Sequence, residues 1–337
     1  MPMTFVLSPS APLYAALDLG TNNCRMLVAR PCGDGFRVVD CFSRITRLGE
    51  GLAASGRLSA EAMARTVDAL SHCADRMARN RVTHARLVAT EACRRAANHR
   101  SFAERVFDAT GLALDIITPA EEAALALAGC ASLLAEDKPR ALVFDIGGGS
   151  TELLWVSHRP GAPRIEGVVS LPLGVVTLAE TRGADLACES GYDRVVADVV
   201  RRLAPFEARH AIAAAMQSGA VQMLGTSGTV TTLAALHLDL ERYDRAQIDG
   251  LHLSFHDIAA VTRRLNAMDS AARARHPCVG PDRADLVVAG CAILEAMCRL
   301  WPLGSLRVAD RGVREGVLLT MMRAPDSTRA AQAGGAA

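Results

Sequence analysis

The stretch 144–152 carries the residues best suited to chemistry, and it lies between two apolar runs. Asp145 follows the first run, three glycines and two hydroxyl residues come next, and Glu152 precedes the second run. Short apolar runs around a Gly-rich turn are typical of a β-hairpin. Glycines leave backbone N–H groups uncovered, which suits a phosphate, and paired carboxylates suit a hard cation such as Mg²⁺. A plain turn needs fewer glycines, so the stretch predicts a hairpin that binds phosphate and metal.

The stretch 17–23 repeats this pattern, with Asp18 in the place of Asp145 and a hydroxyl residue after the glycine. It is not a P-loop, which needs Gly-Lys-Ser/Thr at the start of a helix. It is not a Rossmann fingerprint either, because a strand rather than a helix follows the glycine. Two copies predict a duplicated architecture with one hairpin in each half and a cleft between the halves.

A helix is predicted to begin after Thr118 and to lead towards the second hairpin. Thr118 is a good N-cap, Pro119 fits the first helical position, and Glu121 completes a capping box. Glu122 is not accounted for in this way, because it lies about 100° further around the helix. Its alternatives are a catalytic carboxylate and a first-turn acid favoured by the helix dipole.

Two further segments offer groups for an anion. Arg94 follows a predicted strand over 85–90, and its planar fork could grip a phosphate. The turn 226–229 has the sequence Thr-Ser-Gly-Thr and leads into a predicted helix, whose N-terminus favours anions. The alternatives are a solvated charge for Arg94 and an ordinary helix cap for the turn.

The composition excludes several classes of protein. The formal net charge is +1, which gives no general attraction for nucleic acid. The ten cysteines include no C-x-x-C pair, so neither a disulfide framework nor a zinc site is predicted. No apolar run has the length of a membrane span, and the first residues lack the basic region of a signal peptide. A cytoplasmic protein that binds neither membrane nor nucleic acid is expected.

The chain of 337 residues is comfortable for two α/β domains. A polar break near 136–139 predicts domains over 1–136 and 137–323, followed by a disordered tail over 324–337. Apolar periodicity and turn signals predict helices over 60–79, 101–110, 119–135, 172–181, 192–217, 230–236 and 285–301, the second of them capped by Ser101 with Glu104.

Together these motifs resemble the Ppx/GppA family of exopolyphosphatases and guanosine pentaphosphate phosphohydrolases. The resemblance rests on Glu-Glu-Ala at 121–123, shortly before Asp-Ile-Gly-Gly-Gly-Ser-Thr-Glu at 145–152, and on Asp-Leu-Gly at 18–20. It extends to Arg-Glu-Gly at 314–316, where the roles of Arg311 and Arg314 stay open. It implies an α/β fold of the actin/sugar-kinase/heat-shock-chaperone superfamily, with two ribonuclease-H-like domains and an interdomain cleft.

The resemblance also implies roles for individual residues. By its place in the motif, Glu122 is the base that activates water, with Glu152 and Arg94 as further catalytic residues. Mg²⁺, or another divalent cation, is expected at Asp18, Asp145 and Glu152. The residues expected to bind phosphate are Gly20, Thr21, Asn22, Asn23, Gly147, Gly148, Gly149, Ser150, Thr151, Gly225, Ser227 and Gly228.

The expected activity is Mg²⁺-dependent hydrolysis of the terminal phosphoanhydride of inorganic polyphosphate by a homodimer. One alternative substrate is guanosine pentaphosphate, pppGpp, because it presents a similar terminal bond to the same loops. Another alternative is a regulator that binds nucleotides or alarmones with little catalysis. Because the chain ends after a two-domain core, shorter polyphosphates are expected as substrates. Asn23, where many members of the family have serine, can still donate a hydrogen bond but changes the rim of the first loop.

Overall fold

The computed structural model describes residues 12–159 and 162–323, so the predicted tail over 324–337 lies outside the described residues. The strands are β1 (Tyr14–Leu19), β2 (Asn23–Cys32), β3 (Gly35–Ile45), β4 (His84–Ala89), β5 (Asp115–Ile116), β6 (Arg140–Ile146), β7 (Thr151–Arg159), β8 (Ala162–Leu171), β9 (Val221–Thr226), β10 (His252–Ser254) and β11 (Ser305–Ala309).

The helices are α1 (Leu52–Ser55), α2 (Ala60–Arg79), α3 (Glu91–Arg95), α4 (His99–Thr110), α5 (Pro119–Cys130) with the 3₁₀ turn η1 (Ala131–Leu133), α6 (Val175–Leu186), α7 (Glu189–His210), α8 (Ile212–Met216), α9 (Gly228–His237), α10 (Arg245–Ile248), α11 (Phe255–Asn266), α12 (Ser270–Arg275), α13 (Val287–Leu300) and α14 (Val313–Arg323). None of the helices in the described ranges combines the length and the apolar character that a bilayer crossing requires.

The two β-sheets repeat one topology. The first sheet has the order β3-β2-β1-β4-β5, in which β1, β2 and β3 are antiparallel and β4 and β5 run parallel to β1. The second sheet has β8-β7-β6-β9-β11 with the same directions, and β10 adds one antiparallel strand at its edge. This repetition confirms the predicted α/β fold with two halves, each of which contains one Gly-rich hairpin.

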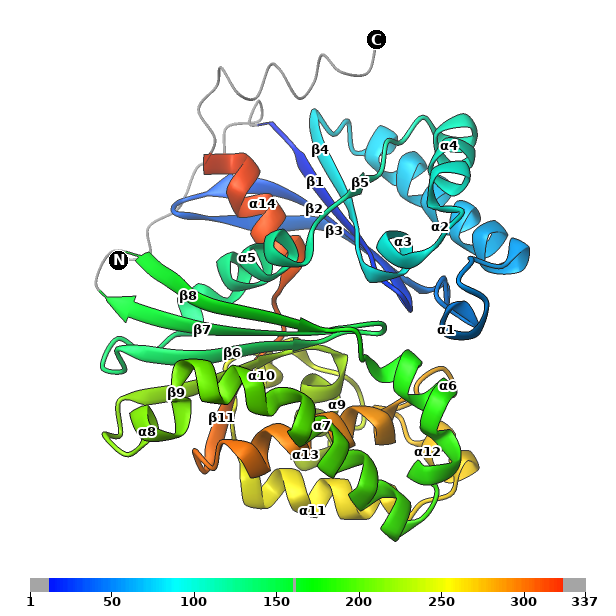
Figure 1. Cartoon of the computed structure of the whole chain (residues 1–337). Coiled ribbons are helices and arrows are strands. Elements are labelled where there is room, and N and C mark those ends of the chain that lie inside the picture. The colour runs from blue at the N-terminus through cyan, green and yellow to red at the C-terminus, as the bar shows by residue number, and fades with distance from the viewer. Residues whose placement is uncertain (1–11, 160–161, 324–337) are drawn as a thin grey trace.

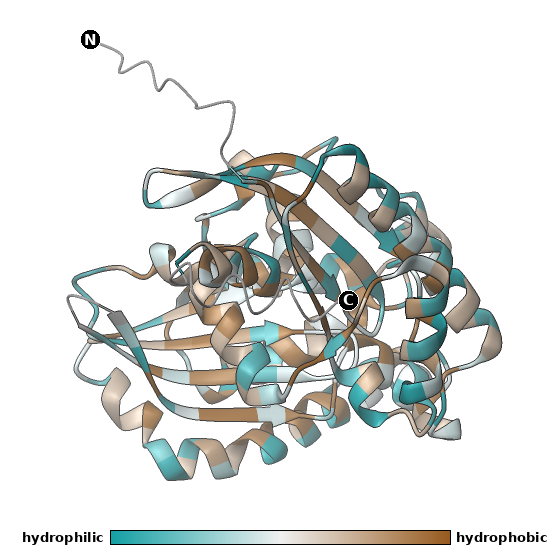
Figure 2. Cartoon of the chain, turned by 90° about the horizontal axis from the view of Figure 1, so that it is seen from above, coloured by the Kyte–Doolittle hydropathy of each residue, from teal (hydrophilic) through white to brown (hydrophobic). Residues whose placement is uncertain are grey.

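The first sheet is covered on both faces. Neighbouring residues of a strand point to opposite sides, so one strand contributes to two cores. In β1, Ala15 and Leu17 pack under α2 and α4, whereas Tyr14 and Ala16 pack against α5 and α14. Figure 1 shows the resulting layers, with α5 and α14 lying between the two sheets. Figure 2 shows hydrophobic residues along the strands and hydrophilic residues on the outer helices. The helix pair α5–α14 therefore connects the two halves.

Glycines allow α5 and α14 to cross at very short range (Figure 1). A Cβ atom on Gly129 of α5 would lie 2.0 Å from the carbonyl oxygen of Gly312. A Cβ atom on Gly316 of α14 would lie 1.9 Å from the carbonyl oxygen of Leu125. The crossing is reciprocal, since each helix presents a glycine to the backbone of the other. Any larger side chain at these positions forces the helices apart.

Most predicted helices are confirmed, and α2 has the predicted bounds. Thr118 caps α5 as predicted, but Glu121 does not complete a capping box, because its carboxylate pairs with Arg86. The predicted cap of α4 at Ser101 is wrong, because α4 already begins at His99. The predicted helix over 192–217 is two helices, separated at Ala211, whose backbone φ is 47°.

The helix predicted over 172–181 begins three residues later, at Val175, for a reason that bears on the site. The N–H group of Val175 donates to the carbonyl of Gly147, and the N–H group of Val176 donates to the carbonyl of Gly148. The first N–H groups of a helix have no partner within it. Here they bind the carbonyls of the second hairpin and so fix the position of its turn.

Candidate active site

Two hairpin turns face each other between the sheets. In the first, the N–H group of Gly20 donates to the carbonyl of Asn23 at 2.9 Å, and in the second Gly147 donates in the same way to Ser150 at 2.9 Å. A Cβ atom on Gly148 would lie 3.0 Å from Cβ of Thr21, and one on Gly149 would lie 2.5 Å from its Oγ1 atom. The missing Cβ atoms therefore allow the two turns to approach each other.

The turns also keep backbone donors free. Within the described ranges, the N–H groups of Thr21, Asn22, Gly148 and Gly149 have no hydrogen-bond acceptor in the protein. Unpaired backbone N–H groups that are gathered in a Gly-rich turn bind anions. These four groups are therefore able to bind the oxygens of an anion such as phosphate.

A cavity of about 540 Å³ lies between the hairpins, the start of α9 and the start of α14. The structure brings most of the predicted site residues together around it. Those that line the cavity are Asp18, Gly20, Thr21, Asn22, Asn23, Glu122, Asp145, Gly147, Gly148, Gly149, Ser150, Ser227 and Gly228. The third turn joins the hairpins as predicted, with Ser227 as the N-cap of α9.

Two of the residues expected to bind phosphate lie behind the lining and have structural contacts instead. The hydroxyl of the fully buried Thr151 donates to the carbonyl of Leu173 at 2.7 Å, so its donor is already used. Gly225 lies against the ring of Phe144, because a Cβ atom on Gly225 would lie only 2.5 Å from the Cζ atom of that ring. The absence of a side chain at Gly225 serves packing here.

Glu122 is held by Arg94, which the sequence suggested as a phosphate clamp. The Nη1 atom of Arg94 donates to Oε2 of Glu122 at 2.7 Å and to the carbonyl of Ile117 at 3.0 Å. Its Nη2 atom donates to Glu91 at 3.0 Å. Both carboxylates and the guanidinium are largely buried. In this arrangement Arg94 orients Glu122 and has little freedom to reach a substrate.

The pKa of Glu122 is raised well above its ordinary value, first by burial and then by the negative charge of Glu152, while Arg94 opposes the shift. A carboxylate with a raised pKa is a stronger base. Glu152 itself lies behind the cavity lining, where it accepts a hydrogen bond from Ser170 at 2.7 Å. Burial raises the pKa of Glu152 as well.

Asp18 and Asp145 both line the cavity, in different surroundings. Burial raises the pKa of Asp145 to about 8, and the charges of Glu152 and Asp18 add to the shift. Burial also raises the pKa of Asp18, but the positive charges of Arg25 and Arg314 oppose it. Among the described residues, no three Asp, Glu, His or Cys side chains form a ready-made metal cluster. The three predicted metal ligands remain a prediction.

Six charged or aromatic residues that line the cavity were not predicted from the sequence: Arg25, Glu91, Tyr243, Arg283, Asp310 and Glu315. A signal for Arg25 was present, because it faces Asp18 in the register of the hairpin. The others lie in loops or at helix ends, where no local pattern marks them. Arg311 and Arg314, whose roles the sequence left open, both line the cavity, and Arg311 pairs with Asp249 at 2.6 Å.

The chain is similar in sequence to several known proteins. The sequence model of the Ppx/GppA phosphatase family matches residues 27–324. Exopolyphosphatase 2 of Mycobacterium tuberculosis is 32% identical over 91% of this chain and 98% of its own length. A guanosine-5'-triphosphate,3'-diphosphate pyrophosphatase of Aliivibrio fischeri is 30% identical over 92% of this chain but only 59% of its own length.

Solved structures have the same fold. The structure of the PPX-GPPA enzyme of Aquifex aeolicus is 30% identical, with a TM-score of 0.76 over 92% of this chain and 99% of that one. An exopolyphosphatase structure from Cytophaga hutchinsonii has a TM-score of 0.83 at 24% identity, with 92% of this chain and 97% of that one covered. The second likeness bears on the fold alone.

Proposed function

The chain belongs to the Ppx/GppA phosphatase family, and on that premise we propose that it hydrolyses the terminal phosphoanhydride bond of inorganic polyphosphate and releases phosphate. One observation carries the proposal. A buried carboxylate, Glu122, is held by Arg94 at the wall of a cavity whose two Gly-rich turns keep four N–H donors free. A phosphate bound by the turns would lie beside a base that can activate water.

In the proposed reaction, Glu122 takes a proton from the attacking water. Its Oε2 atom accepts the Arg94 hydrogen bond, and in the described part of the chain its Oε1 atom has no partner. We therefore assign Oε1 to the water. Arg94 keeps the carboxylate ionised and oriented, and burial with the neighbouring Glu152 makes it more basic. General base catalysis of this kind contributes about 10²- to 10⁴-fold to the rate.

The free N–H groups of Thr21, Asn22, Gly148 and Gly149 would bind the oxygens of the phosphoryl group that is transferred. Their donors point to a fixed place before the reaction begins, which is the condition for electrostatic stabilisation of a transition state. Because the phosphoryl group carries most of its charge on its oxygens, positioning and charge neutralisation are the main tasks of such a site.

A divalent cation fits the acids of the cavity. Asp145 lines the cavity beside two like charges, and a cation would relieve the repulsion that raises its pKa. Asp18, Asp145 and Glu152 would hold Mg²⁺. The described residues contain no ready-made group of three metal-binding side chains. This absence is compatible with Mg²⁺, because Mg²⁺ in proteins keeps waters and substrate phosphates among its ligands. When bound, the cation would neutralise charge on the phosphate oxygens.

Guanosine pentaphosphate is the second candidate substrate, because named relatives act on that class of nucleotide. Tyr243 is the one aromatic residue in the described lining, and a guanine base could stack on its ring. We also propose that the protein works as a cytoplasmic homodimer, for which a molar mass of twice 35.6 kDa in light scattering is the test.

Phosphate release in the presence of Mg²⁺ tests the proposal with three substrates: long polyphosphate, tripolyphosphate and pppGpp. Glu122→Gln should lower release by about 10²- to 10⁴-fold. Glu121→Gln is the matched control, because Glu121 is the adjacent residue and binds Arg86 away from the cavity. Release from pppGpp alone would favour the second candidate. No release from any substrate would refute the enzyme and favour a regulator.

A further inference from the structure

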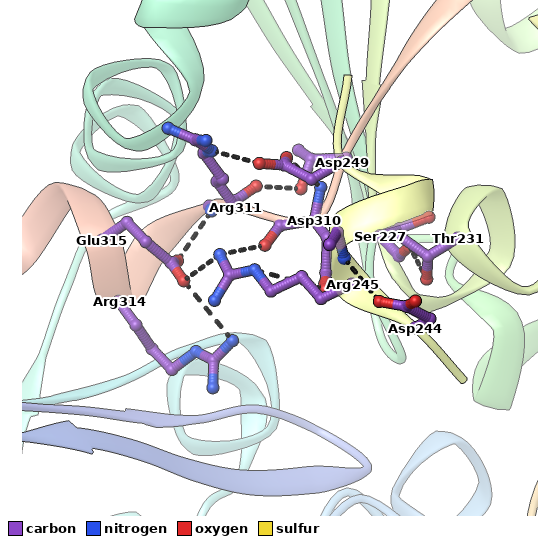
Figure 3. A network of polar contacts seen from close by, with 12 residues as sticks. Ser227, Thr231, Asp244, Arg245, Asp249, Asp310, Arg311, Arg314 and Glu315 are labelled. Atoms are coloured by element: carbon purple, nitrogen blue, oxygen red, sulfur yellow. Dashed lines mark hydrogen bonds and ion pairs between the residues drawn. The ribbon is translucent and has the colours of Figure 1, made fainter. Parts of the chain in front are cut away.

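Arg314 is a buried cation at the cavity for which the proposed reaction so far gives no role. It lies in the first turn of α14, lines the cavity, and its side chain is only 16% exposed. In Figure 3 the side chain extends away from Asp249, Asp310 and Arg245 and towards the blue strands of the first half. There it interacts electrostatically with Asp18 and Arg25 of the first hairpin.

Arg314 differs from Arg311 and Arg283 in having no hydrogen-bond acceptor within the described residues. Arg311 donates to Asp249 at 2.6 Å, and Arg283 donates to the hydroxyl of Thr232 at 3.3 Å. Arg314 has, within the described residues, one ion pair with Glu315 at 3.7 Å and no hydrogen bond. A guanidinium has five N–H donors, and buried donors without acceptors cost free energy. An acceptor is therefore missing at this place.

Glu315 cannot be the main partner of Arg314, because other groups already occupy it. Its Oε2 atom accepts from the N–H group of Gly312 at 2.9 Å, and its Oε1 atom accepts from Arg245 at 3.2 Å (Figure 3). These bonds fix the start of α14. They hold the backbone of Arg314 in place while its guanidinium stays free to bind something in the cavity.

The missing acceptor should be an anion. Burial lowers the pKa of Arg314, and the positive charge of Arg25 acts in the same direction. Arg25 has no ion pair in the described part of the chain, and its charge, like that of Arg314, acts on Asp18. Two guanidiniums therefore share Asp18, while Glu315 is already bound by Arg245 and Gly312. Guanidinium groups bind phosphate oxygens in a bidentate manner.

We propose that Arg314 is a substrate-binding residue that donates to the oxygens of the bound phosphate chain, with Glu315 and Arg245 as the residues that position it. The inference rests on the proposed function, since it concerns the same cavity and a polyphosphate substrate. It adds a guanidinium from the last helix of the second half to the backbone donors of the two hairpins. Arg94, which is occupied by Glu122, does not supply that contact.

Titration calorimetry with tripolyphosphate and Mg²⁺ tests the proposal. The parent is Glu122→Gln, in which turnover is blocked. In this parent, Arg314→Gln should weaken tripolyphosphate binding roughly 10- to 100-fold, as expected for loss of a hydrogen bond to a charged group. Arg314→Lys should recover part of the loss, because it keeps the charge but not the fork. Arg323→Gln, at the exposed far end of the same helix, is the control and should leave affinity unchanged.

A purely structural role for Arg314 predicts a different result. If Arg314 only neutralises Asp18, Arg314→Gln lowers the melting temperature without ligand and leaves tripolyphosphate affinity as in the parent, which would overturn the proposal. Arg314→Lys retains the charge and keeps the test valid should Arg314→Gln unfold. If the parent itself binds neither tripolyphosphate nor pppGpp, the proposed function fails, and that outcome is distinct from equal binding by parent and variant.

Discussion

The two hairpins have the same backbone and different charges. In each, an aspartate lies two residues before the turn, and a closing hydrogen bond runs across the turn. The residue that faces the aspartate in the register is Arg25 in the first hairpin and Glu152 in the second. One repeat therefore presents a nearly neutral pair and the other presents two acids. The two halves share one topology, and the different residue at one register position makes them electrostatically different.

The helices that follow the two sheets differ in the same way. α5 and α14 cross reciprocally through their glycines, and each contributes charged side chains to the cavity from its first turn. The side chain from α5 is Glu122, and those from α14 are Arg314 and Glu315, of which Glu315 is already bound by Arg245 and Gly312. A symmetric scaffold thus supplies a base from one half and a cation from the other. Hydrolysis of a polyanion needs both, so the asymmetry is where function would be found.

The largest expected effect comes from making the second hairpin less acidic. Glu152→Gln keeps the size of the side chain and its contact with Ser170 but removes one charge. Phosphate release should fall at least about 100-fold, comparable to the loss of one preorganised electrostatic contact, and the apparent affinity for Mg²⁺ should fall with it. A Mg²⁺ titration of the release rate measures both.

The equivalent position of the first hairpin provides the contrast. Arg25→Gln should not lower the apparent affinity for Mg²⁺ and should rather raise it, because it removes a positive charge that acts on Asp18 and Asp145 and leaves the acid pair untouched. Glu166→Gln, on β8 and paired with Arg140, controls for a lost charge elsewhere in the same sheet. If Glu152→Gln and Arg25→Gln shift the Mg²⁺ titration equally, the proposed difference between the hairpins is wrong.

The helix crossing gives the next effect, on stability. Gly316→Ala places a Cβ atom 1.9 Å from the carbonyl oxygen of Leu125. Because that oxygen belongs to the backbone of α5, it cannot move aside without shifting the helix. Overpacking of this kind should lower the free energy of unfolding by about 2–3 kcal/mol. Chemical denaturation measures it. Gly183→Ala in α6, whose Cβ would meet nothing within 4 Å, should be close to neutral. Equal stability of the two variants would contradict the close crossing.

Local signals allowed much of the fold and half of the site to be predicted. Apolar runs around glycines predicted both hairpins, and Thr118 with Pro119 predicted the start of α5, because each pattern lies within a few residues. The aspartates and Glu122 followed from their positions in these elements, and all three line the cavity.

The remaining features depend on contacts between distant segments. Arg94 and Glu122 are 28 residues apart, and only the fold shows that one holds the other. The sequence left the role of Arg314 open together with that of Arg311, and only the position of α14 between the sheets shows that it lines the cavity. The glycines of α5 and α14 gave no signal, because a glycine within a helix indicates only a less stable helix until the backbone that it contacts is known.

The acids of the two hairpins should also differ in how they affect stability with pH. In the absence of Mg²⁺, folded Asp145 has a pKa of about 8, against an ordinary value of 3.8. Between these values the folded protein holds a proton that the unfolded chain has lost. The stability associated with this group is fully present below about pH 4. It is lost as the pH rises through 8.

Asp145→Asn removes this titration. With a metal chelator present, the variant should match the wild type near pH 4.5 and exceed it at pH 8.5 by about 1–3 kcal/mol, the cost of a buried group without a partner. Asp18→Asn should give a smaller gain, because Arg25 and Arg314 favour the ionised form of Asp18. Thermal unfolding at the two pH values measures the difference. A gain that is independent of pH would count against the repulsion at Asp145.

The smallest expected effect concerns how the two crossing helices begin. α5 uses a hydroxyl, since Oγ1 of Thr118 accepts from the N–H group of Glu121 at 3.2 Å. α14 uses a carboxylate, since Glu315 accepts from the N–H group of Gly312. Thr118→Ala should lower the free energy of unfolding by about 1 kcal/mol. Thr118→Ser should keep the free energy of unfolding close to that of the wild type, because serine caps a helix equally well. In a thermal scan the alanine variant should melt about 2 °C lower. Equal losses for serine and alanine would show that the methyl group of Thr118 matters more than its hydroxyl, and that α5 is held by packing rather than by its cap.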